Sequence, residues 1–317
     1  MSSISRTITD PAVLARKKNK VIRRLKYEWP LHLMLIPALI AVFIFSYIPM
    51  YGVIIAFQRY NVAMGFNSPW VGMANFEHLF SQPNFVRTIY NTLFIAIWKI
   101  VLMIIVPVIF SLLLNEFRNI FFKRVFQSII FIPNFISWVI LAGVMIELLS
   151  PAGIINRFLG ATFGMEPIWF LGDERVFPWT MIWSDVWRGF GFGTVIYLAT
   201  LTSIDPGLYE AATIDGARRF KQTIYITIPM MMPIVTLMSV LALGNVLHAG
   251  FDQIVNLYNP IVFSTGDIID TYIFRVGLQQ AQFSLGAAVG LFRSLIAGVL
   301  ILLSWYLADR FAGYRIF

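Results

Sequence analysis

The chain has 317 residues, of which 58% are hydrophobic and only 13% are Asp, Glu, Lys or Arg, and its mean hydropathy is +0.76. These values exclude an ordinary soluble globular protein and indicate an integral membrane protein. The net charge of +8 does not indicate nucleic-acid binding, because the basic residues cluster at the ends of apolar stretches, as they do when they orient a chain in a membrane.

Six apolar stretches are long enough to cross about 30 Å of hydrocarbon as helices. They cover residues 33–57, 89–114, 126–149, 178–203, 229–250 and 285–308. The first stretch begins too late and is too long for a cleaved signal peptide. The third and fifth contain internal prolines, which membrane helices tolerate when neighbouring groups satisfy the freed carbonyl groups. The sequence therefore predicts an all-α integral membrane protein with six transmembrane helices.

Basic residues are distributed unequally between two sets of loops. Sixteen lie in the N-terminal tail, the 115–127 and 204–228 loops and the C-terminus, whereas five lie in the loops 58–88, 150–177 and 251–284. Since Lys and Arg accumulate on the cytoplasmic side, both termini are predicted to be cytoplasmic. The expected organisation is a basic cytoplasmic tail at 1–32, a six-span transmembrane domain at 33–308 and a cytoplasmic C-terminus at 309–317.

The loop between the fourth and fifth stretches contains a short charged helix. Asp205 before Pro206 is typical of a helix start and Gly216 of a helix end, so we expect a cytoplasmic helix at about 205–219. Small residues around Ala211 leave one side of this helix nearly bare, which allows another protein to approach its backbone. On these residues alone, a helix that lies on the lipid headgroups is an equal alternative.

The order EAATIDG followed by YITIP resembles the EAA signature of permease subunits of bacterial ABC importers. The resemblance covers nearly all of residues 30–310, through PALIAVFIFSYIPMYG, WVGMANFEHLF and ITIPMMMP, and is similar to the carbohydrate-uptake branch, on the side of the larger permease subunit of the maltose importer. FISWV, LSPAGIIN and DTYIFRVGLQ resemble the subgroup that imports larger oligosaccharides, including alginate fragments. The resemblance implies the type I, MetI-like permease architecture, with the EAA segment as the coupling helix that docks into a cleft of the ATPase subunit.

The resemblance also implies partners and a location. These are a second permease subunit in a heterodimer, two ATPase subunits at the cytoplasmic face, an extracytoplasmic sugar-binding protein and the lipid bilayer of the bacterial cytoplasmic (inner) membrane. The implied ATPase-coupling residues are Tyr209, Glu210, Ala211, Ala212, Asp215, Gly216, Arg218 and Arg219.

The chain carries no sequence pattern for chemistry of its own. It has no G-x-x-x-x-G-K-[ST] run, no catalytic constellation, no cysteine and only three scattered histidines. We therefore expect a translocation subunit that is not an enzyme and binds no metal or cofactor, with ATP and Mg²⁺ used by the partner ATPase subunits.

Ionisable residues within the predicted spans are candidates for the substrate pathway, because a charge in hydrocarbon is costly. Asp185 and Arg188 share one helical face beside several glycines. In the maltose-type family the matching positions contact sugar, whereas an internal Asp185–Arg188 ion pair is an equal alternative. The pathway candidates are Asp185, Trp187, Arg188, Gly189, Asn245, His248 and Arg293.

Several of these candidates have structural alternatives. Trp187, like Phe190, could stack on sugar rings or pack within the protein, and His248 could be satisfied by a backbone carbonyl. Lys99 could extend to a surface, and an acid pair at Asp267 and Asp270 is typical of a solvated face. If Arg188, His248 and Arg293 line one cavity, that cavity is cationic and favours an acidic oligosaccharide such as an alginate fragment.

Other functions are compatible with part of this pattern. Spans interrupted by proline and glycine, with buried charges, also occur in secondary active transporters, and a membrane receptor or structural subunit is a further class. The EAA segment and the lack of a detectable inverted repeat favour the ABC importer. Within that class, a neutral oligosaccharide is the alternative cargo.

Overall fold

The structure is a computed structural model that describes residues 11–117, 119–244 and 247–312. These residues form helices and no strand, which agrees with the predicted all-α class. The chain divides into two units, Met1–Ile54 and Ile55–Phe317.

The first unit is a long helix with a local widening. Helix α1 (Pro11–Val42) continues through the π-helical turn η1 (Phe43–Tyr47) into α2 (Ile48–Met50) and the 3-10 helix η2 (Tyr51–Phe57). The π turn lies just before Pro49, whose missing N–H leaves a carbonyl in the preceding turn without its usual partner. Helix α1 crosses residue 32 without a break, so the boundary expected there between tail and span stays a prediction.

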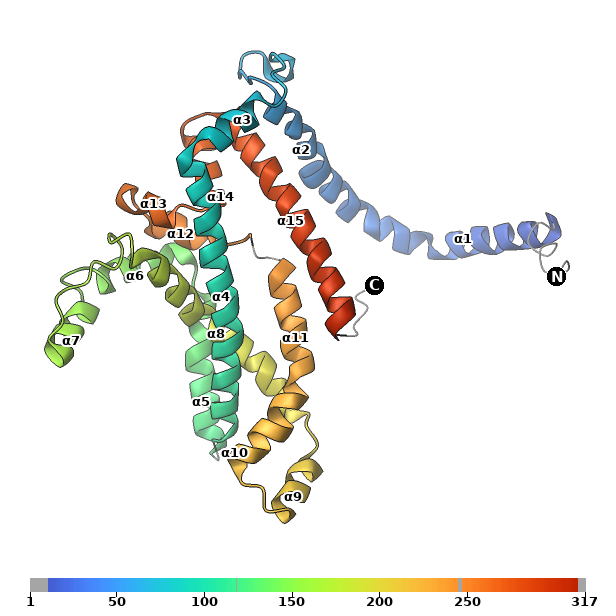
Figure 1. Cartoon of the computed structure of the whole chain (residues 1–317). Helices are drawn as coiled ribbons and strands as arrows, with labels where there is room; N and C mark the ends of the chain where they lie inside the picture. Colours follow the sequence, from blue (N-terminus) through green and yellow to red (C-terminus); the bar gives the residue numbers. More distant parts are fainter. Residues whose placement is uncertain (1–10, 118, 245–246, 313–317) are drawn as a thin grey trace. The chain divides into compact units, whose positions relative to one another are not determined.

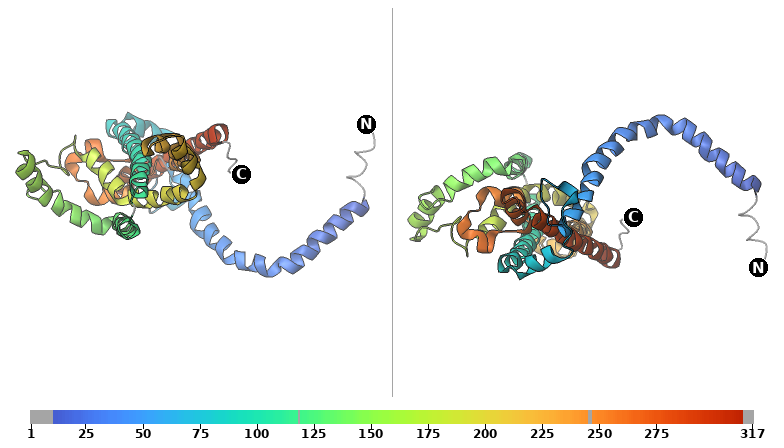
Figure 2. Two further views of the ribbon diagram at one scale, coloured as in Figure 1. Left: turned by 90° about the horizontal axis from the view of Figure 1, so that it is seen from below. Right: turned by 90° about the horizontal axis from the view of Figure 1, so that it is seen from above.

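The second unit contains the remaining helices. The longer ones are α4 (Pro83–Asn115), α5 (Ile120–Phe131), α6 (Trp138–Leu148), α7 (Ile154–Phe163), α8 (Phe177–Thr202), α11 (Ile228–Gly244) and α15 (Phe283–Ala312). The shorter ones are η3 (Gly65–Asn67), α3 (Ala74–Ser81), η4 (Ile132–Phe135), α9 (Pro206–Ile214), α10 (Arg219–Gln222), η5 (Thr223–Thr227), α12 (Phe251–Leu257), η6 (Pro260–Val262), α13 (Phe263–Gly266), α14 (Ile269–Tyr272) and η7 (Ile273–Gln279). Helices α4 and α8 pack along one another, and α7 lies at the edge of this unit, far from α15 (Figures 1 and 2).

Four helical stretches are long and apolar enough to cross a membrane: Tyr27–Phe57, Pro83–Asn115, Arg219–Gly244 and Phe283–Leu303. A fifth is possible if Ile120–Phe135 and Trp138–Leu148, which meet at a bend of 105°, count as one span. Helix α8 has 26 residues but is not among them, because polar residues such as Asp185 and Arg188 lower its hydropathy. The described residues therefore support four or five spans, and the count of six stays a prediction.

Two of the predicted spans are not continuous helices over their expected length. The third bends near Pro133, and Ser137 starts the new helix by accepting a hydrogen bond from the Ile140 amide. The fifth ends at Gly244, before the expected end at residue 250, and Gly250 precedes α12 with a left-handed φ of +98°. By contrast, Pro107 and Pro233 remain inside α4 and α11.

Glycines allow the helices to approach one another closely. Gly189 lies against Met103, and a Cβ at Gly193 would lie 2.9 Å from the Pro107 ring. Gly277 and Gly286 bring η7 and α15 into backbone contact, since a Cβ at Gly286 would lie 2.8 Å from the Gly277 Cα. At these points the backbone packing leaves no room for a larger residue.

We expect Gly286→Ala to lower the free energy of unfolding by about 1–3 kcal/mol, because the two backbones would have to separate. Gly290→Ala, one turn further along α15, is the matched control. A Cβ there meets nothing within 4 Å, so this change should be neutral or slightly stabilising. Thermal unfolding of the purified protein in detergent compares them, and equal melting temperatures for the two variants would contradict the close contact.

Candidate functional site

Asp185, on α8, pairs with a lysine of the neighbouring helix. Its Oδ2 lies 3.2 Å from the Nζ of Lys99, on α4. The alternative of an internal Asp185–Arg188 ion pair is therefore wrong, because α4 covers the face of α8 that carries Asp185. The expectation that Lys99 extends to a surface is also wrong, since its side chain is only 7% exposed.

Arg188 contacts the break between η4 and α6. Its Nε donates to the Ile136 carbonyl at 3.1 Å and its Nη2 to the Asn134 carbonyl at 3.2 Å. Its guanidinium lies 5.2 Å from the centre of the Trp138 ring. These carbonyls are available because a helix end leaves its last C=O groups without helical partners. Within the described ranges, Arg188 has no carboxylate at ion-pair distance.

Arg293, on α15, lies between an acid and a histidine. Its Nε is 3.0 Å from Asp270 Oδ1, and its Nη2 is 3.1 Å from His248 Nδ1. His248 and Arg293 line a cavity of about 170 Å³ together with Gly244 and Ser294. Asn245, the neighbouring pathway candidate, falls outside the described residues.

The acids at 267 and 270 form no solvated face, contrary to expectation. Asp267 is 2% exposed, pairs with Arg275 and accepts a hydrogen bond from Thr271. Burial raises the pKa of the Asp267 carboxyl, while Thr271 and Arg275 oppose that rise. Burial likewise raises the pKa of Asp270, against the opposing charges of Arg293 and His248. Both acids therefore neutralise arginines of their own chain.

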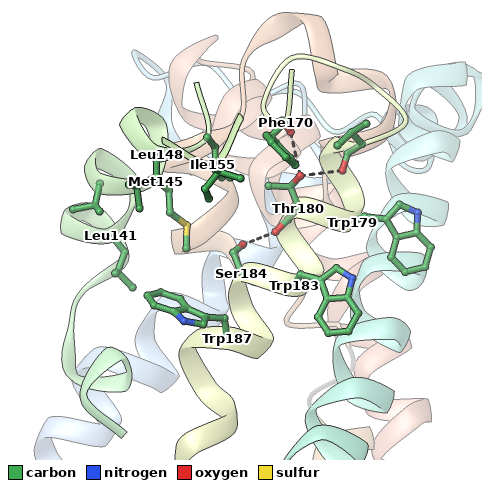
Figure 3. A pocket seen from close by; sticks show the side chains of 13 residues that line it. Leu141, Met145, Leu148, Ile155, Phe170, Trp179, Thr180, Trp183, Ser184 and Trp187 are labelled. Atoms are coloured by element: carbon green, nitrogen blue, oxygen red, sulfur yellow. Dashed lines mark hydrogen bonds between the residues drawn. The ribbon is translucent and has the colours of Figure 1, made fainter. Parts of the chain in front are cut away.

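Trp187 lines a different, strongly apolar cavity of about 540 Å³ (Figure 3). Trp179 and Trp183 precede it at four-residue intervals on α8, a helical spacing that could have been recognised in the sequence. Met145 and Leu148 line the cavity from α6, on the side of Trp187, whereas the rings of Trp179 and Trp183 point away from α6 (Figure 3).

Two further candidates face neighbouring helices. Phe190 packs in a ring contact with Phe110, at 4.7 Å between ring centres, and Gly189 contacts α4. The pathway candidates thus fall in separate places, and Arg188 does not line the cavity of His248 and Arg293. A single cationic cavity therefore stays a prediction.

The expected charged helix is present as α9. Asp205 Oδ1 accepts from the Gly207 amide at 2.9 Å, and Gly216 follows the helix with φ +75°. The helix ends at Ile214, just before the expected stop at Gly216, and α10 begins separately at Arg219, so the helix is shorter than the expected range of about 205–219.

Most of the proposed coupling residues are open to a partner. Glu210, Ala211, Asp215, Gly216, Arg218 and Arg219 are exposed, whereas Ala212 and Tyr209 are half-buried. Tyr209 fixes α9 through its hydroxyl, 3.0 Å from Thr227 Oγ1, and Arg219 pairs with Glu116 at the end of α4. Sequence reasoning missed two exposed apolar residues here, Ile214 and Phe220, which are 87% and 77% exposed. Together these residues form an exposed surface that is suited to protein contact.

No family model matches the chain. The chain is 38% identical over 303 residues, or 95% of its length and 94% of the relative's, to the polygalacturonan/rhamnogalacturonan transport system permease protein YteP of Bacillus subtilis strain 168.

Two solved structures have the same fold. A chain of a bacterial ABC transporter involved in the import of the acidic polysaccharide alginate superimposes with a TM-score of 0.84 at 35% identity, covering 92% of this chain and 99% of that one. A structure of the bacterial alginate ABC transporter in complex with a periplasmic protein that holds an alginate pentasaccharide gives a TM-score of 0.84 at 34% identity, with coverage of 93% and 99%. The chain therefore belongs to the family of permease subunits of sugar-importing ABC transporters.

Proposed function

We propose that this permease conducts an acidic, uronate-containing oligosaccharide across the bacterial inner membrane. Arg188 is the observation that carries the proposal. Lys99 and Arg293 each face a carboxylate of their own chain, whereas Arg188 is held by two backbone carbonyls and has no carboxylate partner among the described residues. A guanidinium in a membrane-spanning chain favours an anionic partner, and a uronate carboxylate supplies one.

The comparisons support the acidic class of cargo. Uronic acids give polygalacturonan and rhamnogalacturonan their charge, and alginate is an acidic polysaccharide. A carboxylate binds a guanidinium through charge-assisted hydrogen bonds, which a neutral hydroxymethyl group in its place does not form. The acidic class therefore fits both the relatives and the environment of Arg188.

The proposed assembly has several chains. This chain and a second permease subunit form the pathway, with six spans in this chain, of which α8 is one, and with both termini in the cytoplasm. Two ATPase subunits at the cytoplasmic face bind and hydrolyse Mg·ATP, since this chain lacks a phosphate-binding loop. An extracytoplasmic protein delivers the sugar.

The coupling contact is proposed at α9. The exposed residues Glu210, Ala211 and Ile214 of α9, with Gly216 directly after it, form the surface that enters the ATPase cleft. Tyr209 and Arg219 link α9 and α10 back to η5 and α4. A movement of the ATPase is thereby transmitted to the spans.

We expect Arg188→Gln to lower uptake of an acidic oligosaccharide about tenfold, through the loss of one charge-assisted contact. Uptake of the carboxyl-reduced, neutral form should change less. Arg175→Gln, in an exposed loop, is the matched control and should leave both rates unchanged. The assay is ATP-dependent uptake by the reconstituted importer at saturating binding protein. An equal loss for both sugars, or none, would argue against the acidic cargo.

We expect Gly216→Trp to detach the ATPase subunits while the spans remain inserted, because bulk prevents close approach to α9. Gly216→Asn is the control, since Asn tolerates the left-handed conformation of this residue. The amount of ATPase that co-purifies with each of the two variants measures docking. A normal yield of ATPase with the tryptophan variant would refute docking at this helix.

The orientation of the chain in the membrane can be tested by labelling single introduced cysteines, because the chain has no cysteine of its own. Ala63→Cys should react with an impermeant thiol reagent in intact spheroplasts, and Lys221→Cys only after the membrane is opened, since the basic loops face the cytoplasm. Both positions are exposed. The reverse pattern would overturn the orientation, and with it the docking surface.

A further inference from the structure

Lys99 is a buried cation to which the proposed function gives no role. Its ammonium nitrogen donates to the Ala249 carbonyl at 2.8 Å and to Gln253 Oε1, and it pairs with Asp185. An ammonium group has three N–H donors. The three acceptors occupy all of them and leave none for a sugar, so a role for Lys99 has to be indirect.

Gln253 extends these contacts to α8. Its Nε2 donates to the Met181 carbonyl at 2.8 Å and to Ser184 Oγ at 2.7 Å. Gln253 is fully buried, so water cannot replace these bonds. Lys99 thus links three elements, α4, α8 and the start of α12, at the point where α11 has ended.

The backbone beside Lys99 is shaped for this contact. Gly250 has φ +98°, and a Cβ there would lie 2.6 Å from the Lys99 Nζ. Glycine therefore allows both the left-handed turn and the close approach of the amine. His248, which contacts Arg293, lies two residues before this turn.

We propose that Lys99 is a positioning residue that prepares the pathway for an anionic sugar in two ways. It anchors the segment 247–250 through its hydrogen bonds. It also neutralises the Asp185 carboxylate through its ion pair, which we call the masking of Asp185. Without Lys99, Asp185 would be an uncompensated carboxylate, and Arg188, three residues later on the same helix, would be its available partner. Lys99 thereby keeps Arg188 free for cargo. This second part rests on the proposed function, whereas the anchoring does not.

Anchoring is tested without any sugar. Leu247 is 4% exposed, so Leu247→Cys in the assembled importer should react slowly with a membrane-permeant maleimide. Adding Lys99→Met should raise the labelling rate about tenfold, because the anchor bonds are lost and the segment opens more often. Lys123→Met, outside the network, should leave the rate unchanged. Equal rates with lysine and methionine at position 99 would overturn the anchoring role.

The masking of Asp185 is tested by uptake of tetragalacturonate. Lys99→Met should lower its uptake about tenfold, because Asp185 then competes for Arg188. Adding Asp185→Asn should restore uptake to within about threefold of the wild type, since Arg188 is free again and no lone charge is buried. In the same double variant, labelling of Leu247→Cys should stay fast.

The two readouts separate the possible failures. Uptake of the double variant as low as that of Lys99→Met would overturn the masking role and leave Lys99 as an anchor only. Unchanged uptake in Lys99→Met would overturn it as well. If the wild type imports only the carboxyl-reduced tetramer, the acidic cargo and the masking role both fail, whereas the labelling result still decides the anchoring role.

Discussion

A charge within a membrane-spanning chain needs a partner, because leaving it alone in a low-dielectric interior costs several kcal/mol. In the second unit this requirement brings together elements that are distant in sequence. Lys99 and Asp185 join α4 to α8, and Asp270 and Arg293 join α14 to α15. Apolar contact alone does little to determine which helices pack together here, since lipid tails compete equally well for an apolar helix face. The ion pairs, together with the close glycine contacts, specify which helices become neighbours.

The same requirement explains the two helix breaks. Backbone carbonyls released in a membrane helix have to be satisfied within the protein. At the break between η4 and α6, Arg188 donates hydrogen bonds to the carbonyls of Asn134 and Ile136. Before α12, Lys99 donates a hydrogen bond to the Ala249 carbonyl. In both places a cation from another helix caps irregular backbone. The two cations differ in one respect: Lys99 also has a carboxylate, and within the described residues Arg188 has none. This difference is the basis on which we propose a positioning role for Lys99 and a cargo contact for Arg188.

The sequence predicted the class and family well, because apolar length, basic-residue distribution and the EAA order are local properties. Asp205 and Gly216 also located the ends of α9. Pairing between helices was not predictable in this way. Asp185 and Arg188 are three residues apart and favourably placed for one another, yet α4 presents Lys99 to Asp185, a contact that depends on how two distant segments pack. Asp267 and Asp270 resembled a solvated face for the same reason, since their arginines, Arg275 and Arg293, become partners only after folding. The all-α membrane class could therefore be predicted from apolar length and the family from the EAA order, whereas the side-chain pairs of the site required the tertiary arrangement.

The most direct test of this account is a structure of the assembled importer with an acidic oligosaccharide in the pathway. We expect a sugar carboxylate within about 3 Å of the Arg188 guanidinium, as in other charge-assisted hydrogen bonds, while Asp185 keeps its ion pair with Lys99. An Asp185 that has moved to Arg188, or a sugar whose carboxylates lie away from Arg188, would contradict it.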